Sequence, residues 1–401
     1  MTVRVNKQPF NLREKLTELE RPIGIKGSEL MKSETVQDAR DLVSAGRKNF
    51  IINGSMMIYQ RGSSTGVTAT GNYGVDRQKY IVQYGTYTMT RQADAPTNAG
   101  FAFSADIDCT TAGSPTAGQS LINRISPLEG YDSERFAYGT SGAKTSTVSF
   151  WIKCSYADSF TLAMVDHDNQ RSCFRSFTIN QADTWEYKTL TFPGDTSGNG
   201  ADNDNSLGLS LDLIIGGGTD WRGSSAPERV WNTRSNNQDS YLTKNVTSFG
   251  TSTSHTMNIT GVQWEFGHNA TEFEHRSYGE ELALCQRYYE VIWQNNNSSS
   301  PHSGGDGYNT IATGAYTGSH GYYVWNYRTQ KRARPSINYA GKFRVLGGAS
   351  ISNLLPNEFY SPGVDAARIR VPHSGSNGQA FVLEFDGGNS SNGYISALAE
   401  L

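Results

Sequence analysis

The sequence has few cysteines, no excess of basic charge and no long apolar run, and each shortage excludes a class of protein. Its four cysteines are widely spaced and form no Cys-x-x-Cys pair, so neither a zinc site nor a dense disulfide framework is expected. The formal net charge is -3, which leaves nothing to neutralise a phosphate backbone, so nucleic acid is not an expected partner. No stretch approaches the ~18 apolar residues of a membrane helix, and no apolar signal core opens the chain, so membrane insertion is not expected.

Long runs of helix-forming residues are also scarce, and the residues present instead suit short strands and tight turns. Charged residues make up only 18%, whereas there are 42 glycines, 21 tyrosines and 17 phenylalanines. Glycine accepts the positive φ of many turns, and aromatic side chains suit a pleated surface. A chain of 401 residues is long enough for two or three domains. The composition therefore predicts a mostly β protein.

Residues 1–48 differ from the rest because they are charged and compatible with helices. Leu12, Leu16 and Leu19 recur at helical spacing, and a second helical pattern covers 33–45. Helices this short are marginal alone, so their apolar stripes need a partner. We predict a helical attachment segment that binds another subunit; the alternative is that it packs on its own domain.

From residue 49 the hydrophobic period becomes two, which is typical of strands with one buried face. The clearest alternations cover 101–107, 147–154 and 207–215. Near Gly261 the alternation reverses its phase, and one extra residue at a glycine predicts a β-bulge. Long glycine-rich loops separate the strands. Together these patterns predict a jelly-roll-like β-sandwich over residues 49–276.

A helix is predicted after the sandwich. Ser277 and Glu280 are placed as a capping box, and an apolar stripe follows, which predicts a connecting helix over 277–293. Two interpretations of the stripe stay open. The helix either closes the sandwich core, or forms a threefold contact with Tyr288 and Tyr289 near the axis.

A second β-rich unit ends the chain. A polar segment, 294–307, is predicted to be a flexible linker that lets a C-terminal β tip domain over 308–401 sit apart from the sandwich. Within the tip, alternation over 323–327 and 381–385 predicts strands. The last segment, 394–401, reads as a strand that is tied into a sheet.

Several short motifs, far apart in the sequence, carry a family signal. They are Asn49-Phe50-Ile51-Ile52-Asn53-Gly54, Gln60-Arg61-Gly62, Asp76-Arg77, Gly261-Val262-Gln263-Trp264-Glu265-Phe266-Gly267 and Glu281-Leu282-Ala283-Leu284-Cys285-Gln286-Arg287-Tyr288-Tyr289. Together they resemble a module of bacteriophage tail-fibre and tail-associated proteins, in which the last strand of a β-sandwich turns into a short helix.

The resemblance implies a virion tail-fibre or receptor-binding protein that contacts host-surface glycans. It further implies a homotrimer, located in the virion tail and assembled in the host cytoplasm, with residues 1–48 as the attachment to other tail proteins. The fold of such a module does not identify the ligand that it binds. A structural adaptor or decoration protein, and less strongly a glycan hydrolase, stay as alternatives.

No constellation in the sequence points to catalysis. Residues 166–168 read as a hairpin tip, because neighbours on a strand point to opposite faces, and 202–205 lack the spacing of a calcium loop. Glu265, Glu272 and Glu274 cluster near the end of the sandwich, where turn and cap roles explain them. We expect no enzyme activity, no cofactor and no metal.

Aromatic residues in polar loops are the candidates for ligand binding, because flat rings stack on the apolar face of a sugar. For the tryptophans, the alternative is that each ring fills the end of the sandwich. A run of basic residues, Arg328, Lys331, Arg332 and Arg334, predicts a positive patch on the tip, suited to acidic glycans. The candidate ligand-binding residues are Trp221, Trp231, Tyr308, Tyr316, His320 and Tyr322.

Overall fold

The computed structural model describes residues 47–221, 227–234, 249–293, 310–347, 349–354, 358–360, 362–385 and 393–401. The chain divides into two units, Met1–Lys48 and Asn49–Leu401, at the position where the composition of the sequence changes. The helices predicted within the first unit lie outside the described residues.

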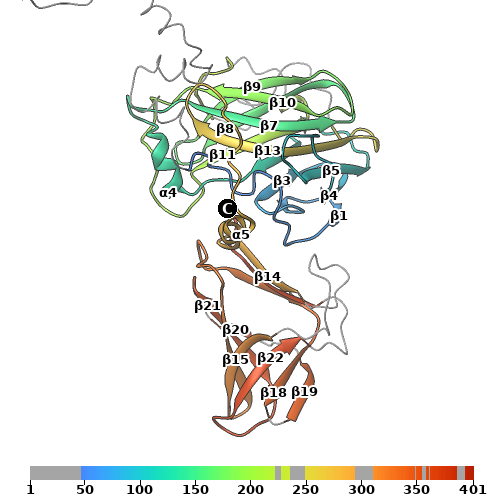
Figure 1. Cartoon of the computed structure of the whole chain (residues 1–401), viewed down its shortest axis with the longest axis vertical. Coiled ribbons are helices and arrows are strands. Elements are labelled where there is room, and N and C mark those ends of the chain that lie inside the picture. The colour runs from blue at the N-terminus through green and yellow to red at the C-terminus, as the bar shows by residue number, and fades with distance from the viewer. Residues whose placement is uncertain are drawn as a thin grey trace, which may run out of the picture. The chain divides into compact units, whose positions relative to one another are not determined.

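Two antiparallel sheets build the sandwich (Figure 1). One has the order β1-β4-β5-β13-β7-β10, formed by Ser64–Val67, Thr86–Gln92, Ser104–Thr111, Thr256–Phe266, Ser146–Cys154 and Glu186–Phe192. The other has the order β12-β9-β8-β11-β6-β3-β2, formed by Asn232–Thr233, Arg171–Ile179, Asp158–Asp166, Leu209–Gly217, Ser120–Ile125, Gln78–Val82 and Gly71–Asn72. Short helical turns join some of these strands: α4 (Gly130–Ser133), η1 (Glu134–Phe136) and η2 (Thr219–Trp221).

One continuous apolar core lies between the two sheets. Phe150 and Ile152 of β7 and Leu211 and Leu213 of β11 are all at most 1% exposed and belong to the same cluster. Their polar neighbours along each strand face away from this core, as a two-layer sandwich requires. The prediction of a mostly β, jelly-roll-like sandwich is confirmed.

The predicted bulge is present in β13. Thr260 pairs with Trp151 and Gln263 pairs with Ser149, so two residues of β13 oppose one of β7. Gly261 holds φ at 62°, a left-handed conformation that glycine adopts without steric cost. The reversed alternation in the sequence therefore reflects the bulge, after which the odd and even positions of β13 exchange the faces of the sheet on which they lie.

The connecting helix is shorter than predicted. Helix α5 covers Tyr278–Gln286 and is capped by the Ser277 side chain, which accepts a hydrogen bond from the Glu280 amide. The prediction of helix up to residue 293 is wrong, because Tyr289–Trp293 forms strand β14 instead, paired residue by residue with β23. Aromatic and β-branched side chains suit that strand, and tertiary pairing outweighs the helical pattern. No helix among the described residues is long and apolar enough to span a membrane.

The C-terminal part has two sheets and a core of its own. One has the order β14-β23-β17, where β23 is Tyr394–Leu398 and β17 is Ser336–Ala340. The other has the order β19-β18-β22-β15-β16-β21-β20, formed by Ala349–Leu354, Phe343–Gly347, Ala380–Phe385, Thr310–Thr317, His320–Asn326, Ala366–Pro372 and Glu358–Tyr360. Trp325, Phe385 and Ile395 are buried in this second core. The last segment of the chain is therefore held in the middle of a sheet, as predicted.

A buried cluster of charges joins the two cores, and we call it the Glu400 junction. The Glu400 carboxylate accepts hydrogen bonds from Arg77 at 2.5 Å and Arg61 at 2.9 Å, and Arg61 also pairs with Asp76 at 2.8 Å. None of these four side chains is more than 9% exposed. Burial alone would raise the pKa of Glu400, but the two guanidinium groups lower it, so the carboxylate stays charged.

The tyrosines that follow α5 complete the Glu400 junction. The Arg77 guanidinium lies 3.4 Å from the centre of the Tyr288 ring, and that of Arg61 lies 3.8 Å from the centre of the Tyr289 ring. Both tyrosines are at most 9% exposed, so they are core residues and are not open to a threefold contact. The predicted linker lies outside the described residues, but the tip is not independent of the sandwich, because buried ion pairs connect them.

Replacing Glu400 by Gln should lower the free energy of unfolding by about 3–5 kcal/mol, because two buried arginines lose a shared counter-charge. Urea unfolding at neutral pH measures the loss. The matched control is Glu384→Gln. Glu384 pairs with Arg344 at 2.8 Å, and the two side chains are more exposed than those of the junction, at 13% for Glu384 and 19% for Arg344. The control should lose about 1 kcal/mol or less. Equal losses in the two variants would contradict a special role for the junction.

Candidate functional site

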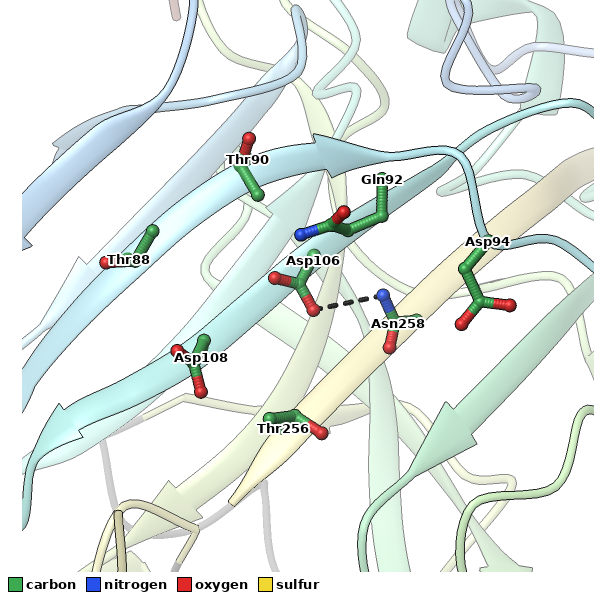
Figure 2. A pocket seen from close by; sticks show the side chains of 8 residues that line it. All are labelled: Thr88, Thr90, Gln92, Asp94, Asp106, Asp108, Thr256 and Asn258. Carbon is green, nitrogen blue, oxygen red and sulfur yellow. Dashed lines mark hydrogen bonds between the residues drawn. The ribbon is translucent and has the colours of Figure 1, made fainter. Parts of the chain in front are cut away.

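The candidate site is an open hollow of about 370 Å³ on the outward face of the sandwich. Three neighbouring strands and one loop supply its lining, which is entirely polar (Figure 2). The lining residues are Thr88, Thr90 and Gln92 of β4, Asp106 and Asp108 of β5, Thr256 and Asn258 of β13, and Asp94 in the loop after β4. We call this set the polar hollow.

Strand register places these side chains in rows across the sheet. Thr90 pairs with Asp106, and Asp106 pairs with Asn258, so the three side chains lie side by side. Asp108 lies in the next row, between Thr88 and a threonine of β13. The residues between these positions on the strands, among them Met89, Ile107 and Met257, are buried in the core. The alternation that builds the core thus also gathers polar groups on the outer face.

The two carboxyl groups of β5 differ in their environment. Asp106 is only 7% exposed and accepts a hydrogen bond from the Asn258 amide at 3.0 Å. Burial, together with the neighbouring charge of Asp108, raises the pKa of Asp106 to about 6. Asp108 is more exposed. A carboxyl group that is kept partly buried at an energetic cost, beside an open hollow, is typical of a functional position.

Asp94 closes one side of the hollow and is held from two directions. Lys153 of β7 forms an ion pair with it, and the Trp185 indole N–H donates to it at 3.1 Å. Partial burial opposes the effect, but these hydrogen bonds hold the pKa of Asp94 below its ordinary value. The Lys153 ammonium also lies 5.5 Å from the centre of the Trp185 ring. An aromatic and a cationic group therefore border the polar lining.

This arrangement suits a ligand rich in hydroxyl or amino groups. Carboxylate oxygens accept hydrogen bonds, threonine hydroxyls donate and accept, and the two amide side chains do both. Three carboxylates outnumber the single ammonium of Lys153, so the hollow disfavours anions. In the described parts of the chain, no group of three or more His, Cys, Asp or Glu side chains is placed to hold a metal ion.

The structure does not bring the predicted aromatic residues together, and it buries three of them. Trp221 and Trp231 are 6% and 8% exposed, and their indole N–H groups donate to the backbone oxygens of Gly118 and Pro193. Trp231 packs in the core between the two sheets, which agrees with the alternative considered for it, whereas Trp221 is buried in a separate apolar cluster with Ile122 and Phe174 of the second sheet. Tyr316 is 7% exposed, and its hydroxyl donates to the backbone within its own turn. These three rings offer no free face for stacking.

The other predicted tip residues are only partly accessible. His320 and Tyr322 are half-buried, with the His320 ring 2.9 Å from the Arg370 guanidinium and the Arg368 guanidinium 5.2 Å from the centre of the Tyr322 ring. Tyr308 lies outside the described residues. His320 and Tyr322 both lie on β16 and do not line a hollow with the tryptophans.

The predicted positive patch on the tip is largely absent. Lys331 is 1% exposed and pairs with Glu290 at 2.7 Å. Arg332 is half-buried and donates to the backbone oxygens of Asn205, Ala399 and Glu400. Only the outer two, Arg328 and Arg334, are exposed. Arg332 therefore joins the tip to the sandwich, Lys331 is buried against α5 and β14, and neither contributes to an exposed positive patch.

The acidic residues considered for catalysis have structural roles. Asp166 ends the β8–β9 hairpin opposite Arg171, which confirms the hairpin tip. Glu265 accepts hydrogen bonds from the amide and the hydroxyl of Thr271, at 2.9 and 2.6 Å, and so fixes the turn after β13. Glu274 accepts from the Asn49 amide at 2.8 Å. They stabilise the end of the sandwich, as expected from their positions.

The polar hollow was not among the sequence predictions, although a signal for it exists. Each of its three strands carries hydroxyl, amide or acidic residues at every second position, in the segments 88–92, 106–108 and 256–258. Such residues on an outer face are usually only solvated. The pattern indicates a site only when the pairing of β4, β5 and β13 is known, because these strands are far apart in the sequence.

No protein family matches the sequence, and no curated protein matches it. Among solved structures, the enzymatically active domain of tailspike protein 4 of bacteriophage CBA120 shares 12% identity over 55% of this chain and 21% of that chain, with a TM-score of 0.25. A putative sugar-binding protein from Bacteroides thetaiotaomicron shares 12% identity over 55% of this chain and all of that chain, with a TM-score of 0.29. A family 11 carbohydrate-binding module from Clostridium thermocellum shares 12% identity over 54% of this chain and 98% of that chain, with a TM-score of 0.25. Such low TM-scores decide nothing, and the site is interpreted from its own residues.

The variant Asp106→Asn should be more stable than the wild type at about pH 8, by on the order of 1–3 kcal/mol. The folded protein binds the Asp106 proton more tightly than the unfolded chain does, because the pKa is raised to about 6. The stability that this proton confers is present at low pH and is lost as the pH rises from about 4 to about 6. Asn copies the neutral form, so the difference should vanish near pH 4. Thermal unfolding at both pH values measures it, and a variant less stable at about pH 8 would contradict the assignment.

Proposed function

We propose that this protein binds a glycan in the polar hollow. The observation that carries the proposal is the concentration of acidic, amide and hydroxyl side chains in one open depression on the outward face of the sandwich. Sugars present several hydroxyl groups in a fixed geometry, and convergent polar side chains on a rigid sheet match them at low entropic cost. Bordering aromatic rings, here Trp185, suit the apolar faces of sugar rings.

The charge of the hollow narrows the ligand to neutral or amino-bearing glycans. Its lining has Asp94, Asp106 and Asp108, and the bordering Lys153 is already paired with Asp94. An acidic sugar would meet carboxylates of the same sign, which costs binding energy. The expectation of acidic glycans relied on a basic patch on the tip, but two of its four residues are engaged within the protein: Lys331 pairs with Glu290, and Arg332 donates to the backbone of Asn205.

We further propose that the glycan belongs to a host cell surface and that the protein is a component of a phage tail. The support is the resemblance of the motifs in 49–293 to tail-fibre modules. In this proposal residues 1–48 bind other tail proteins and three chains form a homotrimer. The solution mass should then be three times the 44.0 kDa of one chain, and a stable monomer at micromolar concentration would overturn that part.

On an array of neutral, amino-bearing and acidic glycans, the full chain should bind members of the first two classes and avoid the third. Asp108→Ala should weaken binding by roughly tenfold or more, because a charged acceptor for a ligand hydroxyl or amine is lost. The matched control is Glu134→Ala, which removes an exposed carboxylate outside the hollow and should bind like the wild type.

Two results would count against this assignment. An array on which no glycan is bound by the wild type would favour the structural adaptor alternative, and equal binding by Asp108→Ala would place the ligand elsewhere. The bound glycan should also yield no new reducing ends, since we propose that the chain is not an enzyme. If reducing ends appear, Asp106 and Asp108 are the carboxylates to replace, because Glu265 and Glu274 are engaged in the turns after β13.

Removing residues 1–48 should abolish incorporation into phage particles while glycan binding by residues 49–401 is retained. The physical reason is that the chain divides at this position, so the second unit keeps its cores and the polar hollow. Incorporation is measured by blotting purified particles from cells that produce only the shortened chain. Normal incorporation would contradict an attachment role for this segment.

A further inference from the structure

The outward face that contains the polar hollow continues onto the next two strands. Asn258 of β13 pairs with Lys153 of β7, and in the neighbouring row Thr260 pairs with Trp151. Trp151 in turn pairs with Tyr187 of β10. Trp151 and Lys153 alternate with Phe150 and Ile152, which are buried in the core, so the first two face outward. The hollow and these side chains therefore share one surface.

Trp151 and Tyr187 form an aromatic platform beside the hollow. Their ring centres are 5.3 Å apart, and the ring planes meet at 47°. Tyr187 is 46% exposed, one of the most exposed large apolar side chains among the described residues. A single exposed ring is ordinary. Two outward rings in contact, next to a polar depression, match the mixed apolar and polar surface of a sugar chain.

The bulge at Gly261 positions this platform. A Cβ atom on Gly261 would lie 2.6 Å from the Phe101 ring and 3.2 Å from the Trp151 ring, so only glycine allows both rings to approach β13. The left-handed conformation of Gly261 adds a second reason for glycine. The same residue that changes the phase of β13 thus makes room for Trp151 above the sheet.

We propose that the ligand of this face is an extended oligosaccharide that crosses the strands obliquely, with one sugar in the polar hollow and a following sugar stacked on Trp151 and Tyr187. This inference rests on the proposed function. From β5 to β10 the path crosses β13 and β7, three strand spacings or roughly 14 Å, which is longer than one sugar ring. Lys153 and Trp185 lie along the path, between the hollow and β10.

The test uses the full chain and a series of oligosaccharides from one to six units, made from a neutral or amino-bearing glycan that the wild type binds on the array. Affinity should rise with length until the platform is reached. Tyr187→Ala should weaken binding of the longer members by roughly 5- to 10-fold and leave the monosaccharide unchanged. Tyr187→Trp should restore binding, because it supplies another ring. Tyr131→Ala, a ring 55% exposed on α4, is the matched control and should bind like the wild type.

The outcomes separate this inference from the proposed function. If the wild type binds no glycan, the proposed function fails and this inference fails with it. If the wild type binds but its affinity does not depend on length, or if Tyr187→Ala binds the longer members like the wild type, the crossing path is overturned while binding in the hollow stands. A melting temperature of Tyr187→Ala equal to that of the wild type ensures that a loss of affinity is not a loss of folding.

Discussion

The shared hydrogen bonding of Glu400 with Arg61 and Arg77 is the interaction on which the rest of the second unit depends. Each guanidinium is buried and also stacks on a tyrosine ring, so the cluster combines charge, hydrogen bonding and apolar contact. A buried ion pair is worth little compared with an apolar replacement, but it tolerates only one geometry. Here it fixes how two separate cores meet, because neither core extends across the contact.

This cluster also gives a physical meaning to motifs that the sequence offered only as a resemblance. Asp76, Arg77 and the tyrosines after α5 are far apart in the chain, and they meet in one place. The Asn53 amide donates to the Glu281 carboxylate, which ties the first motif to the helix. The motifs are therefore mainly a structural device. They describe the frame and leave the outward faces of the strands free to differ.

The strands and the bulge were predictable because local alternation encodes them, and the long alternation around 207–215 became the centre of a sheet. The helix was predicted to extend to residue 293. Residues 289–293 form a strand instead, because they pair with β23, more than a hundred positions later in the chain. Three of the aromatic candidates are buried for a related reason. The polar residues around Trp221 in the sequence do not determine where its side chain points, and in the structure the ring is buried. The polar hollow depends on pairing between distant strands, which no local pattern contains.

The bulge in β13 separates two kinds of outward-facing position on one strand. Before Gly261 the outward residues of the strand, such as Asn258, line the polar hollow, and after it Gln263 and Glu265 hold the turn that leads to α5. One strand thus carries residues of the hollow before the bulge and residues that stabilise the following turn after it. Under the proposed function, substitutions before the bulge are expected to alter ligand binding, while the hydrogen bonds that hold the turn after β13 are kept.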